Sequence, residues 1–216
     1  MDFAAARAAM VERQIVARGI ADPHVLAAMG EVAREAFVPP AQLARTYEDG
    51  PLPIEAGQTI SQPYIVALMV EAAGVAPGAT VLEIGAGSGY AAAILGRIAS
   101  RVVAIERHAE LAELAAARMR RLGYGNVEIV HGDGSAGWPD EAPFDAILAA
   151  ASGSHVPQVL LDQLRVGGQL VMPIGGTHEI QDLVRVTRVD TDAFERESLC
   201  PVRFVPLIGA AGWTGK

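Results

Sequence analysis

Residues 79–90, which read Ala-Thr-Val-Leu-Glu-Ile-Gly-Ala-Gly-Ser-Gly-Tyr, constrain the fold more than any other stretch of this chain. An apolar run over 81–84 breaks into Gly85, Gly87 and Gly89, and a helical pattern follows at once. The pattern predicts a buried strand, a tight glycine turn and the start of a helix. Because glycine has no Cβ, a ligand can lie directly on the backbone N–H groups of such a turn. The stretch therefore indicates a nucleotide-like ligand.

After this turn the chain alternates between short apolar runs and helical patterns. We expect strands near 79–84, 101–105, 126–130, 144–149 and 168–172, with helices near 89–98, 108–122 and 157–164. Such alternation predicts an α/β fold with a doubly wound, mostly parallel sheet. Later strands are expected at 182–189 and 201–207, where antiparallel pairing is an option.

The part before the glycine turn has a different pattern. Helices are expected over 4–18, 22–37 and 64–73, and an irregular segment rich in Gly, Pro and Asp is expected over 46–63. No internal repeat and no linker divides the chain. We therefore expect a single domain over 1–216, with N-terminal helices and a substrate or lid segment in 1–75 and the α/β core in 76–216.

Composition narrows the class of protein. The chain has 216 residues, of which 51% are hydrophobic, so one sizeable core is expected. A formal net charge of −8 argues against nucleic acid as a partner. No apolar run reaches the length of a membrane span, and the N-terminus lacks a secretory signal. The single cysteine, Cys200, permits no internal disulfide, so we expect a cytoplasmic protein with no membrane partner.

Candidate cofactor contacts fall where predicted strands end, since ligands of doubly wound sheets bind beyond the carboxyl ends of the strands. These candidates are the glycine turn, Glu106 after the second strand and Asp133 after the third. Glu106 follows the glycine turn at the spacing of an acidic residue that binds ribose hydroxyls. The alternative is that Glu106 is a solvated residue at a helix start, favoured by the helix dipole.

Tyr90 decides between two kinds of nucleotide-like ligand. A dinucleotide fingerprint has a third glycine where Tyr90 stands, because helix and strand must approach closely at a pyrophosphate site. The spacing therefore favours a nucleoside ligand without phosphates. The alternation of Glu83, Gly85, Gly87 and Gly89 resembles the first motif of class I S-adenosylmethionine-dependent methyltransferases.

The segment over 47–64 is too apolar and too rich in proline for a plain surface loop. Gln58, Thr59 and Ser61 are polar residues among apolar neighbours, and loops held on a rigid scaffold commonly carry binding groups. The alternative is that Ser61 only caps the helix that follows Pro63.

Longer blocks surround these residues. They are Pro51-Leu52-Pro53-Ile54, Gly57-Gln58-Thr59-Ile60-Ser61-Gln62-Pro63, Ile105-Glu106-Arg107, His131-Gly132-Asp133-Gly134, Ala142-Pro143-Phe144-Asp145-Ala146-Ile147 and Val202-Arg203-Phe204-Val205-Pro206-Leu207. Together with the glycine turn, they resemble the protein-L-isoaspartate O-methyltransferase family, in register from about Met10 to Leu207. The block over 57–63 is far more specific than the general methyltransferase motif.

This resemblance implies a fold and a reaction. The fold is a seven-stranded sheet whose last two strands are exchanged relative to most class I methyltransferases. The reaction transfers a methyl group from S-adenosyl-L-methionine to the free α-carboxylate of L-isoaspartyl residues in damaged proteins and peptides, and leaves S-adenosyl-L-homocysteine. The methyl ester leads through a succinimide back towards normal aspartate. The resemblance implies no metal, and a monomer is expected.

The resemblance also assigns residues to the substrate. Ser61 matches the family's active-site serine. The lid and substrate channel would be formed by Gln58, Thr59 and Ile60, and the substrate backbone would be held by Val205, Pro206 and Leu207.

Other residues are assigned to the cofactor. Its methionine part would be surrounded by Glu83, Gly85, Gly87 and Ser88. Glu106 would hold its ribose, with Arg107 beside it, and the adenine edge would meet Asp133 and Gly134.

One segment departs from the family pattern. Over 149–157 the family's proline before the final Val-Pro is missing, and the segment contains Gly153, so we expect a less rigid wall there. Two rival functions stay open. One is another carboxyl or small-molecule methyltransferase on the same fold, against which the 58–63 block argues. The other is a non-catalytic module that binds S-adenosylmethionine and a protein partner, supported only by the altered segment.

Overall fold

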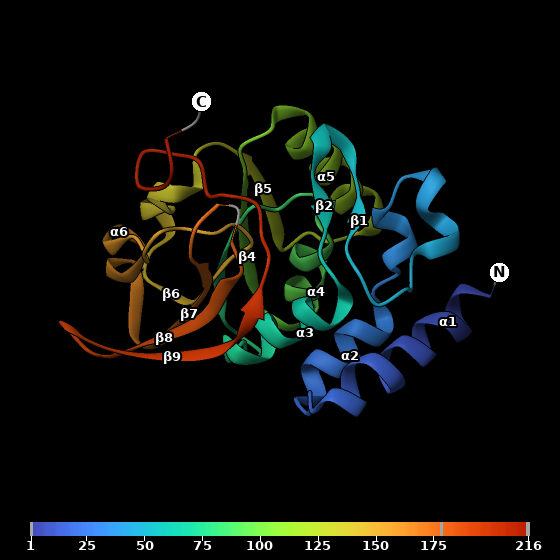
Figure 1. The fold of residues 1–216 in the computed structure, drawn as a ribbon, viewed down its shortest axis with the longest axis horizontal. Coiled ribbons are helices and arrows are strands. Elements are labelled where there is room, and N and C mark those ends of the chain that lie inside the picture. Colours follow the sequence, from blue (N-terminus) through green and yellow to red (C-terminus); the bar gives the residue numbers. More distant parts are fainter. Residues whose placement is uncertain (1, 178, 215–216) are drawn as a thin grey trace.

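A seven-stranded sheet with the order β5-β4-β3-β6-β7-β8-β9 forms the centre of the computed structural model, which describes residues 2–177 and 179–214 (Figure 1). Its parallel strands are β3 (Thr80–Ile84), β4 (Arg101–Glu106), β5 (Val127–His131), β6 (Phe144–Ala149) and β7 (Leu164–Ile174). β8 (Gln181–Asp190) runs antiparallel to β7, and β9 (Ala193–Val202) runs antiparallel to β8. The predicted α/β class is confirmed, and the last two strands follow chain order at this edge, as the resemblance implied.

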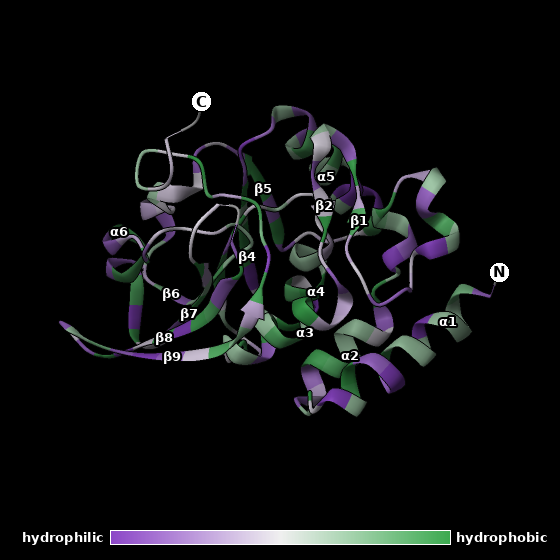
Figure 2. Ribbon diagram, viewed as in Figure 1, coloured by the Kyte–Doolittle hydropathy of each residue, from purple (hydrophilic) through white to green (hydrophobic). Residues whose placement is uncertain are grey.

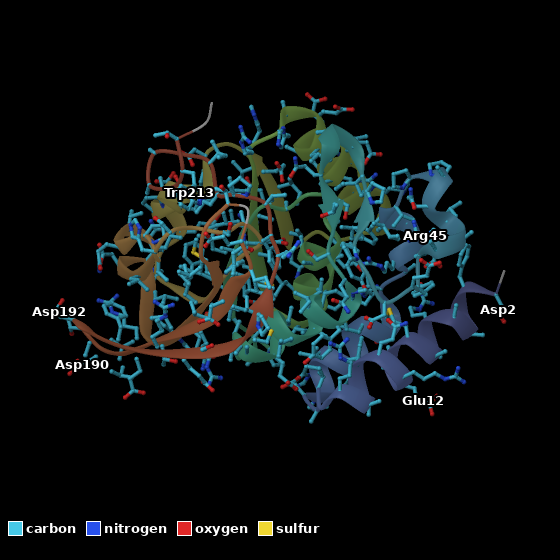
Figure 3. All side chains as sticks on the ribbon, viewed as in Figure 1. Asp2, Glu12, Arg45, Asp190, Asp192 and Trp213 are labelled. Carbon is cyan, nitrogen blue, oxygen red and sulfur yellow. The ribbon has the colours of Figure 1, made fainter. Side chains whose placement is uncertain are left out.

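The prediction of a final strand at 201–207 was wrong. β9 ends at Val202, and Pro206 makes only an isolated bridge with Ser152. Most β9 side chains are exposed, because the strand lies at the edge of the sheet. Its Glu-Arg-Glu-Ser stretch lacks the apolar alternation of a half-buried strand, which is why it was missed. Figure 2 shows hydrophilic residues along this outer hairpin, and Figure 3 places Asp190 and Asp192 at its tip.

Two hydrophobic clusters cover the two faces of the sheet. Alternate strand residues divide between them, since Val81 and Val102 pack in one cluster and Leu82 and Val103 in the other. The first cluster receives the N-terminal helices with α3 (Pro63–Ala72), α4 (Tyr90–Ile98) and α5 (Ala109–Leu122), and the second receives α6 (Gln158–Asp162). Short 3-10 turns at Gly134–Ala136 and Pro139–Glu141 lie between β5 and β6.

The N-terminal helices are more broken than predicted. α1 (Phe3–Met10) continues into a π-helical turn (Val11–Ile15) and a 3-10 turn (Val16–Arg18), and Gly19 ends them with φ of 95°. α2 (Pro23–Glu31) is capped by the Asp22 carboxylate but ends before the predicted residue 37, and 3-10 turns follow at Arg34–Phe37 and Pro40–Arg45. This break buries the Arg34 and Phe37 side chains completely.

A small hairpin lies inside the segment predicted to be irregular. β1 (Leu52–Pro53) pairs with β2 (Thr59–Ile60), and a tight turn over Glu55–Gly57 joins them. A Cβ added at Gly87 would lie 3.7 Å from Ile54 Cδ1, so the hairpin tip packs on the glycine turn. The hairpin thus connects the N-terminal helices to the strand ends (Figure 1). Within the described residues, no helix is long and apolar enough to cross a membrane.

Candidate active site

A cavity of about 980 Å³ opens at the carboxyl ends of β3 and β4, where the fold predicts a ligand. Segments that are far apart in sequence form its walls: residues 58–62, the glycine turn with Glu83, the end of β4, and residues 201–208. The lining includes the sequence-predicted residues Gln58, Thr59, Ile60, Ser61, Glu83, Gly85, Gly87, Ser88, Glu106, Arg107, Gly134, Val205, Pro206 and Leu207. The chain therefore brings together every predicted site residue except Asp133.

The glycine turn has the conformation that its sequence predicts. Gly85, Gly87 and Gly89 have φ values of 87°, 53° and 86°, a region that residues with a Cβ rarely adopt. A Cβ at Gly89 would also lie 3.0 Å from Met119 Cε. Tyr90 then begins α4 with its ring buried, and burial raises the pKa of its hydroxyl to about 12. Glycine is thus required by backbone conformation at a surface that faces the cavity.

Two acidic side chains are buried beside this turn. Glu106 is 4% exposed, and its carboxylate accepts hydrogen bonds from the Gly87 N–H at 2.8 Å and the His108 N–H at 2.9 Å. The alternative of a solvated Glu106 was therefore wrong. Burial raises the pKa of Glu83 well above its usual range, and the nearby charge of Glu106 raises it further. The Glu83 Oε2 atom is buried without a hydrogen-bond partner among the described residues, so it is an oxygen for a ligand to bind.

Asp133 is not among the residues that line the cavity, unlike its neighbour Gly134. Its carboxylate accepts hydrogen bonds from the Ser135 N–H at 2.9 Å and the Ala210 N–H at 2.7 Å. Burial alone would raise the pKa of Asp133, but these hydrogen bonds outweigh burial and hold the pKa below its usual value. Gly134 lines the cavity, whereas the Asp133 side chain fastens the C-terminal segment to the end of β5.

Ser61 lies in the cavity wall directly before α3. The N-cap of α3 is Gln62, which makes no side-chain capping hydrogen bond, so the alternative that Ser61 caps this helix was wrong. The Ser61 carbonyl accepts a hydrogen bond from Arg34 Nη2 at 2.9 Å. At the glycine turn, the guanidinium of Arg118 in α5 donates a hydrogen bond to the Ser88 carbonyl at 3.2 Å. The same guanidinium lies 3.6 Å from a carboxylate oxygen of Glu55. A buried arginine, Arg34, and a half-buried one, Arg118, therefore hold the two walls.

The altered segment after β6 is more constrained than its sequence indicates. The Ser152 N–H donates to the Val205 carbonyl at 2.8 Å, and its own carbonyl accepts from the Leu207 N–H at 2.8 Å. Gly153 donates to the Pro173 carbonyl and accepts from the Gly175 N–H. A Cβ at Gly153 would lie 2.7 Å from the His155 carbonyl oxygen. Backbone hydrogen bonds thus replace the missing proline as the constraint on this wall.

Sequence reasoning missed several residues of the site. Thr177 and Ile180 line the cavity from the connection between β7 and β8, and Ile180 is 63% exposed. In the sequence, an isoleucine near a glycine pair only weakly indicates a binding residue, and only the fold places Ile180 at the cavity. Arg34 carried no signal either, since it lies in a segment predicted to be plain helix. Within the described residues, no group of three or more His, Cys, Asp or Glu side chains could hold a metal ion.

Sequence comparison gives one consistent result. The family model for protein-L-isoaspartate(D-aspartate) O-methyltransferase matches residues 5–212. A protein-L-isoaspartate O-methyltransferase of Rhodopseudomonas palustris is 58% identical over 204 residues, which are 94% of this chain and 94% of the relative. A protein of the same name from Methylorubrum populi is 57% identical over 211 residues, 98% of this chain and 99% of the relative.

Solved structures agree with the sequences. A protein-L-isoaspartate O-methyltransferase structure superposes with a TM-score of 0.86 at 31% identity, over 95% of this chain and 67% of that one. A Plasmodium falciparum beta-aspartate methyltransferase, solved in complex with S-adenosyl-L-homocysteine, superposes with a TM-score of 0.80 at 27% identity, over 94% of this chain and 98% of that one.

Proposed function

Because the chain belongs to the protein-L-isoaspartate(D-aspartate) O-methyltransferase family, we propose that its cavity binds S-adenosyl-L-methionine next to an L-isoaspartyl residue of a damaged protein or peptide. The reaction is that family's methyl transfer to the free α-carboxylate. One observation carries the proposal: the glycine turn, the Ser61 segment and residues 201–208 share one cavity although they are far apart in sequence.

The residues present suit S-adenosyl-L-methionine. The glycine turn offers backbone without Cβ atoms, and the buried Glu83 Oε2 has no partner among the described residues, which suits a polar group of the methionine part. Glu106 is fixed by the Gly87 and His108 N–H groups, so its remaining lone pairs are oriented for ribose hydroxyls. Gly85, Ser88, Arg107 and Gly134 complete this half of the cavity. Asp133 contributes by holding the backbone beside it.

The other half of the cavity suits a peptide. Gln58, Thr59 and Ile60 come from the hairpin, and Val205, Pro206 and Leu207 face them from the C-terminal segment. The Val205 side chain is 40% exposed. Ser152 holds this segment in an extended form through the bonds at 205 and 207. We assign the substrate backbone to this side, with the Ser61 hydroxyl orienting the carboxylate.

The chemistry needs little from the protein beyond placement. The substrate carboxylate, with an ordinary pKa near ~4, is ionised at neutral pH and is already a nucleophile. The bound sulfonium cofactor supplies an activated methyl group. The chain's own residues then bind, orient and exclude water, and such positioning can lower a barrier by roughly 7–11 kcal/mol. No side chain therefore has to act as a general base.

Organisation and location follow from the same features. One hydrophobic cluster runs from Met10 through the sheet to Val202, which supports a single domain over 1–216. We propose a monomer as the working unit, since residues of this chain line both the glycine-turn side and the 58–62 side of the cavity. A lone cysteine, Cys200, supports a reducing compartment, and we propose the cytoplasm.

The proposal is tested by following a synthetic isoaspartyl peptide by mass spectrometry with enzyme and S-adenosyl-L-methionine. We expect a methyl ester, then the succinimide, then a growing fraction of the normal aspartyl peptide. Calorimetric titration with S-adenosyl-L-homocysteine runs in parallel. Binding without any methyl ester would favour the non-catalytic module, and methylation of other carboxylates alone would favour a different methyltransferase.

A further inference from the structure

Arg34 is a buried arginine with no acidic partner in the part of the chain that the structure describes. The residue has 0% exposure, although arginine is almost never fully buried unless it is paired. None of the ion pairs among the described residues includes it. The guanidinium stays protonated, since arginine is not deprotonated in proteins. A full positive charge is therefore present inside the N-terminal half of the molecule.

The contacts of this guanidinium lead to the cavity wall. Nη2 donates to the Ser61 carbonyl at 2.9 Å, and Nε donates to the Thr46 carbonyl at 2.9 Å. The guanidinium carbon lies 4.8 Å from the centre of the Tyr90 ring, at the start of α4. Both Ser61 and Tyr90 line the cavity, whereas Arg34 lies behind them. Nη1 is buried and has no hydrogen-bond partner within residues 2–177 and 179–214.

Stability does not explain this charge. Burying an unpaired cation costs free energy, and two hydrogen bonds to neutral carbonyls only partly offset that cost. A neutral side chain could fill the same volume without the desolvation penalty. An uncompensated charge next to a functional wall therefore points to a role in the reaction.

The electrostatics of the cavity supply such a role. The proposed substrate is an anion, yet the chain carries a net charge of −8 and the cavity contains Glu83 and Glu106. Arg107 and Arg203 also line the cavity, but both are exposed, so solvent and salt screen their charges. Arg118 is largely buried but lies beside the Glu55 carboxylate. Arg34 differs from all three, because it is buried and pairs with no acidic side chain among the described residues.

We propose that Arg34 is a positioning residue of the methyl transfer: it fixes the Ser61 peptide against Tyr90 and supplies the buried positive potential that favours the substrate α-carboxylate. The inference rests on the proposed function. Arg34 acts through Ser61 and through its field, without contacting the substrate. The buried charge of Arg34 also explains how a protein with a net negative charge binds a substrate carboxylate.

The test compares Arg34→Met with Arg34→Lys on two peptides. One is an L-isoaspartyl peptide, and the other is its neutral α-carboxamide analogue, used as a competitive inhibitor. We expect Arg34→Met to raise KM for the anionic peptide about tenfold, while Ki of the neutral analogue changes less than about twofold. Arg34→Lys should restore most of the affinity, and the affinity for S-adenosyl-L-homocysteine should stay unchanged in both. Equal weakening of both peptides, or no change in KM, would overturn the inference.

Two further variants serve as controls for the Arg34→Met substitution. Arg101→Met removes an arginine at the opposite end of β4, where it pairs with Glu128 and Glu141, and should leave both peptide constants unchanged. If Arg34→Met does not fold, Arg34→Gln replaces it, since glutamine can still donate a hydrogen bond but has no charge. Gln performing as well as Lys would contradict the electrostatic role. If the unaltered protein does not methylate the isoaspartyl peptide, the proposed function itself fails, which is a separate result.

Discussion

The Asp133 carboxylate accepts a hydrogen bond from the Ala210 N–H at 2.7 Å, across 77 residues of sequence. The Ala211 N–H donates to Ser135 Oγ at 3.0 Å. The indole N–H of Trp213, which is labelled in Figure 3, donates to the Ser152 carbonyl at 2.9 Å. These contacts fix the chain that follows Leu207. The end of β5 therefore determines where the substrate-facing segment lies.

Replacement of Asp133 by alanine should act on the substrate side more than on the cofactor side. Loss of this carboxylate removes the acceptor of the exposed Ala210 N–H, which water can then solvate, and we expect the free energy of unfolding to fall by about 0.5–1.5 kcal/mol. KM for an isoaspartyl peptide should rise severalfold. Thermal melting and steady-state kinetics measure the two effects. A larger loss in affinity for S-adenosyl-L-homocysteine than for peptide would instead support the adenine contact predicted from the sequence.

Glu83→Gln should stabilise the ligand-free protein at neutral pH. The pKa of Glu83 is raised in the folded state, so the folded form holds its proton more tightly than the unfolded form does. The stability that goes with this proton is complete below the unfolded pKa, near ~4.3, and is lost as pH rises towards the folded pKa. Glutamine removes that pH-dependent loss.

The same variant should bind S-adenosyl-L-homocysteine more weakly, because Glu83 offers a free oxygen to the ligand. Melting temperatures from pH 4 to 8 test the expected gain in stability, and calorimetry tests the expected loss in affinity for S-adenosyl-L-homocysteine. A variant that is less stable than the parent at neutral pH would contradict a raised pKa for Glu83.

Gly153→Ala should destabilise the wall beside residues 205–207. The new Cβ would lie 2.7 Å from the His155 carbonyl oxygen and 2.8 Å from Met172 Cε, and relief requires backbone movement. Overpacking of this kind costs about 1–3 kcal/mol. Gly30→Ala is a matched control, since Gly30 is exposed within α2 and nothing lies within 4 Å of its added Cβ. It should stabilise by roughly 0.5–1 kcal/mol. Denaturant unfolding that ranks the two variants in the opposite order would show that the wall is flexible.

Ser61→Ala should lower the rate of methyl transfer while leaving cofactor binding intact. The hydroxyl orients the carboxylate, and the backbone of Ser61 stays held by Arg34 in the variant. Loss of one hydrogen bond to a charged group corresponds to about 1.5–3 kcal/mol, or roughly a tenfold to hundredfold lower kcat/KM. Kinetics indistinguishable from those of the parent would remove this role from Ser61.

The sequence predicts the glycine turn and the position of Glu106 beside it, because both depend on local rules. The glycine turn needs positive φ values, and Glu106 stands at the end of a strand adjacent to β3, so both follow from spacing. Neighbouring parallel strands then bring the two together without further information.

Long-range hydrogen bonds are what the sequence does not predict. The partners of Asp133, Ser152 and Arg34 lie in distant segments, and no local pattern identifies a backbone N–H or carbonyl as the partner. The same limit applies to β9, whose edge position removes the hydrophobic alternation of a strand. The predicted adenine contact of Asp133 stays a prediction, whereas its hydrogen bond to the Ala210 N–H is one that spacing does not indicate.

The most direct test of the account is methyl transfer from labelled S-adenosyl-L-methionine to two peptides that differ only in linkage, one with L-isoaspartate and one with L-aspartate. The proposed function predicts label on the isoaspartyl peptide alone, and loss of that label at alkaline pH as the methyl ester converts to succinimide. Equal labelling of both peptides, or of neither while S-adenosyl-L-homocysteine still binds, would contradict it.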